Sequence, residues 1–194
     1  MKCKIVTVTN QKGGVGKTTT AINLAAGLSE KMLNVLLIDL DSQANATQGL
    51  GIDKNKVSKS IYEVIMGEIE PELAVHSTAN VFLDIIPSSV SLNGAKVELV
   101  NMSEREYRLK NVLEYLKSSY DYIIIDSPPS LDLLTINSLV ASDSAIIPIQ
   151  CEYYALEGLG QLMNTLARVK KGLNPHLEVE GVVLTMYDSR TNLS

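Results

Sequence analysis

A glycine-rich stretch near the N-terminus carries the strongest structural signal of the sequence: Gln11-Lys12-Gly13-Gly14-Val15-Gly16-Lys17-Thr18-Thr19-Thr20. It follows a short β-branched run and begins a pattern typical of an amphipathic helix, the context that a phosphate-binding loop requires. Glycines let backbone N–H groups turn inward around a phosphate, and the first turn of the helix adds the positive end of its dipole. The alternative is a glycine-rich turn with an incidental lysine, which leaves this context unexplained.

Two side chains of the loop have the chemistry to bind a magnesium–nucleotide complex. The Lys17 ammonium group would reach the β- and γ-phosphates, and the Thr18 hydroxyl would ligate Mg²⁺. The expected nucleotide-binding residues form one run: Lys12, Gly13, Gly14, Val15, Gly16, Lys17, Thr18 and Thr19.

Short apolar, β-branched runs alternate along the chain with longer helical patterns. The predicted strands are residues 4–10, 34–40, 81–87, 121–126, 144–149 and 178–186. The predicted helices are residues 16–31, 58–66, 104–118, 131–141 and 156–172. This repetition indicates an α/β fold with a doubly wound, mostly parallel sheet and helices on both faces, as in P-loop NTPases.

Length and composition favour a single domain over residues 1–194. The 194 residues are 45% hydrophobic, which is enough for one compact α/β core. Two longer polar connections, residues 49–60 and 87–103, are expected to be mobile switch or interaction loops. The sequence stops directly after a predicted strand, so we expect a further C-terminal segment beyond Ser194.

Carboxylates follow two of the predicted strands. Asp39 and Asp41 lie at the end of the run 34–40, where a period of two places them on one face of the sheet. Asp126 ends the apolar run 121–126, the Walker B arrangement, and could hold Mg²⁺ through water. Ligands of this architecture bind at the carboxyl ends of strands. Taken alone, each carboxylate could instead be a strand-end cap or a surface charge.

The loop departs from the strict pattern G-x-x-x-x-G-K-[ST], because the first position falls on Gln11. It resembles the deviant Walker A of the ParA/MinD family. Residues 150–158 and 184–192 are similar to chromosomal Soj-type ParA proteins, so the resemblance covers essentially the whole chain. It implies an ATPase that converts ATP to ADP and phosphate with Mg²⁺.

The resemblance also assigns roles to single residues. Lys12 matches the signature lysine, which contacts nucleotide across a dimer interface, and Asp41 matches the residue that orients the attacking water. Arg190 falls where a DNA-contacting arginine is expected. The alternatives are a solvated lysine at position 12 and an exposed loop arginine at position 190. The predicted site residues are Lys12, Lys17 and Asp41 for catalysis, Thr18 and Asp126 for the metal, and Arg190 for DNA.

Residues 39–45 look like the switch segment of the same family, with two differences. Family members commonly carry proline and glycine where this chain has Ser42 and Ala44. Both differences bear on the rigidity of the loop and on the rate of hydrolysis.

The resemblance implies a bacterial, cytoplasmic, nucleoid-associated switch. Two copies would close around ATP and bind double-stranded DNA without sequence specificity, and a ParB/Spo0J-type partner would stimulate hydrolysis. The net charge of −5 gives no global attraction for DNA, so binding would need a local patch. The alternatives are a MinD-like membrane-associated ATPase, a nucleotide-gated regulator without catalysis, and a metabolic enzyme such as the nitrogenase-reductase-like or dethiobiotin-synthetase-like proteins. The Soj-like segments 153–158 and 188–192 decide against the first of these. A nitrogenase-reductase-like enzyme is disfavoured because Cys3 and Cys151 lie in strand-like segments and not where a shared iron–sulfur cluster would need them.

Other features of the sequence indicate what to exclude. Cys3 and Cys151 lie in apolar, strand-like surroundings and are expected to be small core residues of a reduced protein. His76 and His176 stand at no metal-ligand spacing relative to them, so we expect no zinc or iron–sulfur site. No apolar stretch approaches the roughly 20 residues of a membrane-spanning helix.

Overall fold

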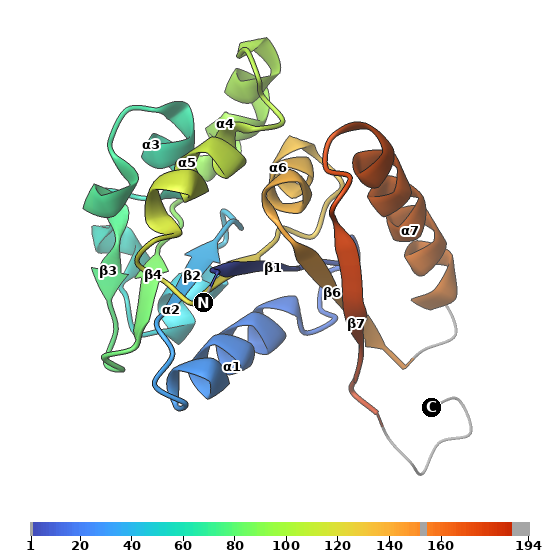
Figure 1. Cartoon of the computed structure of the whole chain (residues 1–194), viewed down its shortest axis with the longest axis horizontal. Helices are drawn as coiled ribbons and strands as arrows, with labels where there is room; N and C mark the ends of the chain where they lie inside the picture. The colour runs from blue at the N-terminus through green and yellow to red at the C-terminus, as the bar shows by residue number, and fades with distance from the viewer. Residues whose placement is uncertain (1, 152–154, 188–194) are drawn as a thin grey trace.

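The computed structural model describes residues 2–151 and 155–187, and a seven-stranded sheet runs through its centre (Figure 1). The strand order is β3-β4-β2-β5-β1-β6-β7, and every neighbouring pair is parallel except β3–β4. The strands are β1 (Lys4–Val8), β2 (Val35–Asp39), β3 (His76–Ser77), β4 (Leu83–Ile86), β5 (Tyr122–Asp126), β6 (Ser144–Gln150) and β7 (Glu178–Thr185). This arrangement confirms the predicted doubly wound, mostly parallel α/β fold.

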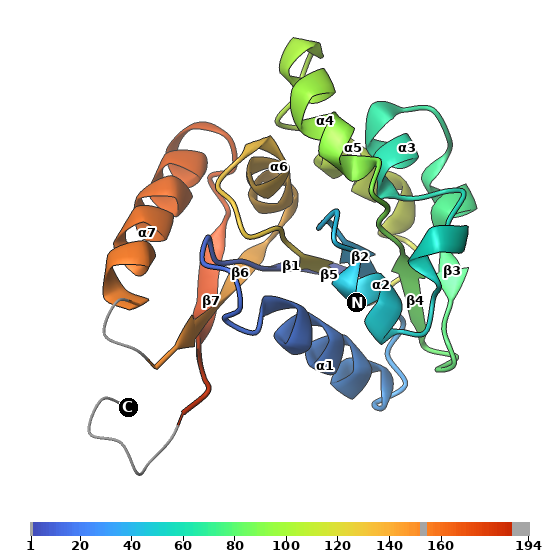
Figure 2. The same cartoon turned by 180° about the vertical axis from the view of Figure 1, so that it is seen from behind.

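Helices cover both faces of the sheet, as the opposite views of Figures 1 and 2 show. The α-helices are α1 (Lys17–Ser29), α2 (Asn45–Gly49), α3 (Ile61–Met66), α4 (Leu92–Glu98), α5 (Arg108–Leu116), α6 (Leu133–Ala141) and α7 (Ala155–Gly172). Short 3-10 helices are η1 (Lys54–Lys56), η2 (Pro71–Ala74) and η3 (Leu99–Asn101). Helices α1 and α2 lie on one face, and α3 to α6 lie on the other, where α7 packs against α6.

The alternation of side chains along the central strands divides the core in two. Leu36 and Ile38 of β2 pack in the cluster under α3, α4, α5 and α6, whereas Val35 and Leu37 pack in the cluster under α1. All four side chains are fully buried. Continuous apolar runs of this kind are typical of parallel strands covered on both faces.

The sheet register brings the carboxyl ends of three strands together. Asp126 is paired with Val8 of β1 on one side and with Asp39 of β2 on the other. The end of β1 leads directly into the glycine-rich loop. The predicted phosphate loop and the predicted carboxylates therefore meet at one edge of the sheet.

One expectation for the connections is wrong. Residues 87–103 are not a polar loop, because they contain α4 and η3, with Leu92, Ala95 and Leu99 fully buried against the core. The first connection, residues 49–60, also contains one 3-10 turn, η1.

The two cysteines differ in their surroundings. Cys3 is buried just before β1, as expected, and burial raises the pKa of its thiol to about 11. Cys151 follows the end of β6 and is only partly buried, which corrects the expectation that both are core residues.

Candidate functional site

The phosphate loop joins strand β1 to helix α1. Gly14 and Gly16 have φ values of +74° and +85°, a left-handed conformation that glycine adopts without strain. Within the described residues, no side chain caps the start of α1 by a hydrogen bond. Its first backbone N–H groups therefore point to the loop without a side-chain partner, as a phosphate site requires.

A cavity of about 350 Å³ opens beside this loop. It brings the loop together with the segment after β2 and with residues from two distant parts of the chain. The cavity is lined by Gly13, Gly14, Gly16, Lys17, Thr18, Thr19, Asp41, Gln43, Asn45, Pro129 and Met186.

Lys17 is the buried cation of the site. Its side chain is 7% exposed, and Nζ donates a hydrogen bond to the Lys12 carbonyl oxygen at 3.0 Å. Burial lowers the pKa of this ammonium group, while the charges of Asp126 and Asp41 raise it. An ammonium group near carboxylates at the N-terminus of a helix is well suited to contact phosphate oxygens.

Asp126 is a buried carboxylate whose surroundings fit a metal site. It is 1% exposed, the Thr18 hydroxyl lies beside it, and neither carboxylate oxygen accepts a hydrogen bond of good geometry from the residues that the structure describes. Burial raises its pKa to about 7, as does the charge of Asp39, whereas the nearby Thr18 hydroxyl and Lys17 lower it. Buried carboxylates normally have partners, and a metal ion or its water ligands would be a suitable partner for this one.

The donor set fits Mg²⁺ rather than a transition metal. Thr18 and Asp126 offer hard oxygen atoms, and Mg²⁺ commonly keeps several waters and takes one or two protein ligands plus phosphates. No cluster of three or more His, Cys, Asp or Glu side chains that could hold a metal occurs in residues 2–151 and 155–187.

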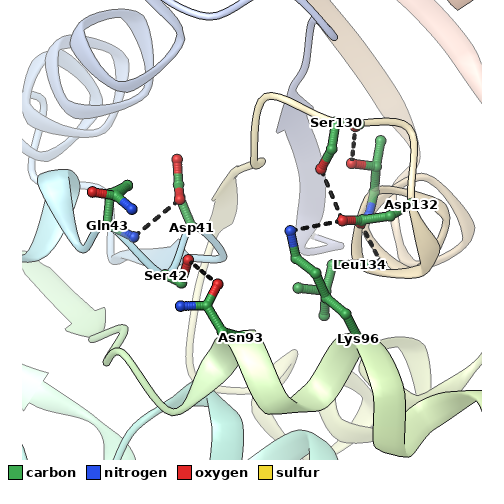
Figure 3. A network of polar contacts seen from close by, with 9 residues as sticks. Asp41, Ser42, Gln43, Asn93, Lys96, Ser130, Asp132 and Leu134 are labelled. Carbon is green, nitrogen blue, oxygen red and sulfur yellow. Dashed lines mark hydrogen bonds and ion pairs between the residues drawn. The ribbon is translucent and has the colours of Figure 1, made fainter.

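Asp39 and Asp41 have different surroundings. Asp39 is fully buried and accepts hydrogen bonds from Thr47 N and Thr47 Oγ1 at 2.8 and 2.7 Å, so it holds the start of α2. Burial raises its pKa to about 6, and the Thr47 hydrogen bonds oppose this shift. Asp41 lies beyond the end of β2 and lines the cavity, and its Oδ1 accepts from Gln43 N at 3.0 Å (Figure 3). The two residues thus have separate tasks.

The two sequence differences in this segment are accommodated by the fold. Ala44 is buried with φ +56°, the left-handed conformation that glycine adopts more readily. Ser42 Oγ donates a hydrogen bond to Asn93 Oδ1 of helix α4 at 2.8 Å.

The predicted site residues Val15 and Lys12 are not among the described residues that line the cavity. The Val15 side chain is buried and its carbonyl oxygen accepts from Thr185 Oγ1 at 2.9 Å, so only its backbone can serve a nucleotide. Lys12 is partly exposed at the start of the loop, where its N–H donates to Asn10 Oδ1 at 3.0 Å. Arg190 lies outside the described residues.

Several residues of the cavity were missed by sequence reasoning. Gln43 and Asn45 lie in the switch-like segment, so a signal for them existed. Pro129 and Met186 reach the cavity only because β5 and β7 end near the loop, which no local pattern indicates.

The described part of the chain contains no helix that is long and apolar enough to cross a membrane.

Comparison with known proteins gives a consistent picture. A family model described as an AAA domain matches residues 3–179. The chromosome partitioning protein ParA of Myxococcus xanthus is 53% identical over 191 residues, which are 98% of this chain and 68% of that protein. The sporulation initiation inhibitor protein Soj of Bacillus subtilis is 56% identical over 190 residues, which are 98% of this chain and 75% of that protein.

A solved structure agrees with the fold. Crystal structures of cobyrinic acid a,c-diamide synthase from Mycobacterium smegmatis, with ADP or an ATP analogue and magnesium, match with a TM-score of 0.94. The sequence identity is 42%, over 97% of this chain and 77% of that chain.

Proposed function

Since this chain belongs to the ParA/Soj family of chromosome-partitioning ATPases, we propose that it is a switch in which ATP joins two copies and hydrolysis separates them. ATP and Mg²⁺ are the cofactors of the proposed reaction. The observation that carries the proposal is the convergence of an uncapped helix start, the buried Lys17 and the Asp41 carboxylate at one cavity, with the buried Asp126 carboxylate at the end of the neighbouring strand β5.

The side chains around the cavity have distinct tasks in this proposal. The backbone of the loop and Lys17 bind the phosphates, and Thr18 with Asp126 holds Mg²⁺, which neutralises charge on the phosphate oxygens when bound. Asp41 accepts a proton or a hydrogen bond from the attacking water and so directs it. Asp39 holds the segment that carries Asp41 and has no direct part in the reaction.

In this proposal Lys12 contacts the nucleotide of the second copy in the dimer. It lies at the start of the loop, is partly exposed, and is not among the residues that line the cavity of its own chain. A cation placed there can reach the nucleotide of a second copy and stabilise charge in the transition state, as an arginine finger does.

Partner binding extends the same proposal. We propose non-specific binding of double-stranded DNA by the ATP dimer and stimulation of hydrolysis by a ParB/Spo0J-type protein, in the bacterial cytoplasm at the nucleoid. The identity to the two partition proteins, 53% and 56%, exceeds the 42% identity to the diamide synthase, which favours partition over a metabolic reaction. The high identity to partition proteins also favours this reading over a membrane-associated ATPase.

Arg190→Ala is expected to weaken ATP-dependent binding to duplexes of any sequence about equally, because phosphate contacts carry no base information. If Arg190 neutralises one phosphate, the slope of log K against log salt falls by about one unit. Anisotropy over a salt series, with ATP and with ADP, measures both effects.

Arg105→Ala is the matched control for this experiment, because Arg105 is already paired with Glu106 at 2.9 Å. It is expected to leave the salt slope unchanged. Equal DNA binding with ATP and ADP would contradict the proposed switch, and an unchanged slope in Arg190→Ala would contradict the assignment of that residue.

A further inference from the structure

Helix α4 contacts both loops that carry the proposed catalytic groups. Asn93 Oδ1 accepts the hydrogen bond of Ser42, the residue directly after Asp41, at 2.8 Å. Lys96 Nζ lies 2.9 Å from Oδ2 of Asp132, on the segment that follows Asp126. Figure 3 shows both side chains leaving the same helix toward the two loops. A spacing of three residues places them on one face of α4.

The first contact lies next to the Asp41 carboxylate, and the second holds the start of α6 at the end of the loop that follows Asp126. On one side, Gln43 N donates to Asp41 Oδ1 at 3.0 Å, so the residue after Ser42 orients the Asp41 carboxylate. On the other side, Asp132 caps the start of α6, where its Oδ1 accepts from Leu134 N at 3.0 Å. The Ser130 hydroxyl donates to the same Oδ2 atom that Lys96 contacts, at 2.9 Å. Polar contacts therefore fix the position of both loops relative to α4.

Helix α4 is fixed in place by buried side chains that pack against the sheet. Leu92, Ala95 and Leu99 are fully buried in the cluster that includes Leu36 and Ile38 of the sheet. Moving α4 would disturb close-packed side chains, whereas the contacts that join it to the two loops are polar and at least partly exposed. A rigid helix between two such loops can make the position of one depend on the position of the other.

We propose that α4 bridges two loops: residues 40–44, which carry Asp41, and residues 127–132, which follow Asp126. In this proposal Asn93 and Lys96 are positioning residues for ATP hydrolysis. The inference rests on the proposed role of Asp41. Neither side chain lines the cavity, so both act through the loops rather than on the nucleotide. The hydroxyl of Ser42 is essential to the bridge, since a proline at this position would have no group to donate.

The bridge is tested by steady-state phosphate release at varied ATP concentration, with Asn93→Ala, Lys96→Ala and the double variant. Each single variant is expected to lower kcat by about 2- to 10-fold, the range for loss of one hydrogen bond or one partly exposed ion pair. KM for ATP is expected to stay within about twofold, because the phosphate contacts are untouched. Lys96→Arg retains a cation and is expected to recover most of kcat.

Tyr62→Phe is the matched control, because it removes the 2.9 Å hydrogen bond from Tyr62 to Glu98 on the same helix without touching either loop. It is expected to leave kcat unchanged. Ser42→Ala breaks the Ser42–Asn93 bond from the other side, so it replaces Asn93→Ala if that variant does not fold, with the same expected result.

The double variant distinguishes a bridge from two separate anchors. Breaking either end disconnects the loops, so the double variant is expected to be about as slow as the slower single variant. Multiplied effects, as independent sites show, or an unchanged kcat in both single variants would overturn the bridge. Absence of hydrolysis by the unaltered protein would instead overturn the proposed function, and this inference with it.

Discussion

Lys17→Ala is expected to weaken ATP binding by roughly 10²- to 10⁴-fold. The substitution removes the buried ammonium group that lines the cavity beside the loop. Hydrogen bonds to charged groups contribute about 1.5–3 kcal/mol each, and Lys17 would contact two phosphates. Calorimetric titration with Mg-ATP measures the loss.

A control variant and the expected stability of the fold tie this loss of affinity to the Lys17 side chain. Lys31→Ala changes an exposed lysine just beyond the same helix and is expected to leave the ATP affinity unchanged. The fold is expected to remain intact in Lys17→Ala, because burial disfavours the charge that is removed. Unchanged affinity together with unchanged turnover in Lys17→Ala would refute the phosphate-loop assignment.

Asp41→Ala is expected to lower ATP hydrolysis by about 10²- to 10⁴-fold while ATP affinity changes little. The carboxylate lines the cavity and would position the attacking water, and loss of a positioned base has about this effect. Because hydrolysis would separate the copies, the variant should accumulate as an ATP-bound dimer. Phosphate release and equilibrium ATP binding separate the two effects.

Asp41→Asn is the informative companion of this variant. The amide oxygen can still accept the hydrogen bond of Gln43 N, so the loop keeps its shape while the negative charge is lost. We expect Asp41→Asn to be nearly as slow as Asp41→Ala. Hydrolysis at the parent rate in Asp41→Asn would reduce Asp41 to a residue that only shapes the loop.

The sequence predicted the fold where local pattern and tertiary environment agree. The strand Val35–Asp39 is a continuous apolar run, and such a run fits a parallel strand covered on both faces. The two-residue strand β3 has no period to detect. Helix α4 contains Asn93 and Gly94, both poor helix formers, and it forms because Leu92 and Ala95 are buried against the sheet.

The sequence indicates candidate site residues only where they lie in a local motif or at the end of a strand. Lys17, Thr18, Asp41 and Asp126 stand at strand ends or in a local motif, and parallel strands bring such ends together. The contacts of α4 with the two loops depend on where that helix packs, which no spacing along the chain encodes. The structure alone shows the links between Ser42 and Asn93 and between Lys96 and Asp132.

ATP, and not ADP, is expected to join two copies of this chain. Sedimentation velocity of the unaltered protein with Mg²⁺ and a non-hydrolysable ATP analogue, compared with Mg-ADP, tests it most directly. We expect a species of twice the single-chain mass with the analogue, a monomer with ADP, and loss of the dimer in Lys12→Ala. The same mass in both nucleotide states would contradict it.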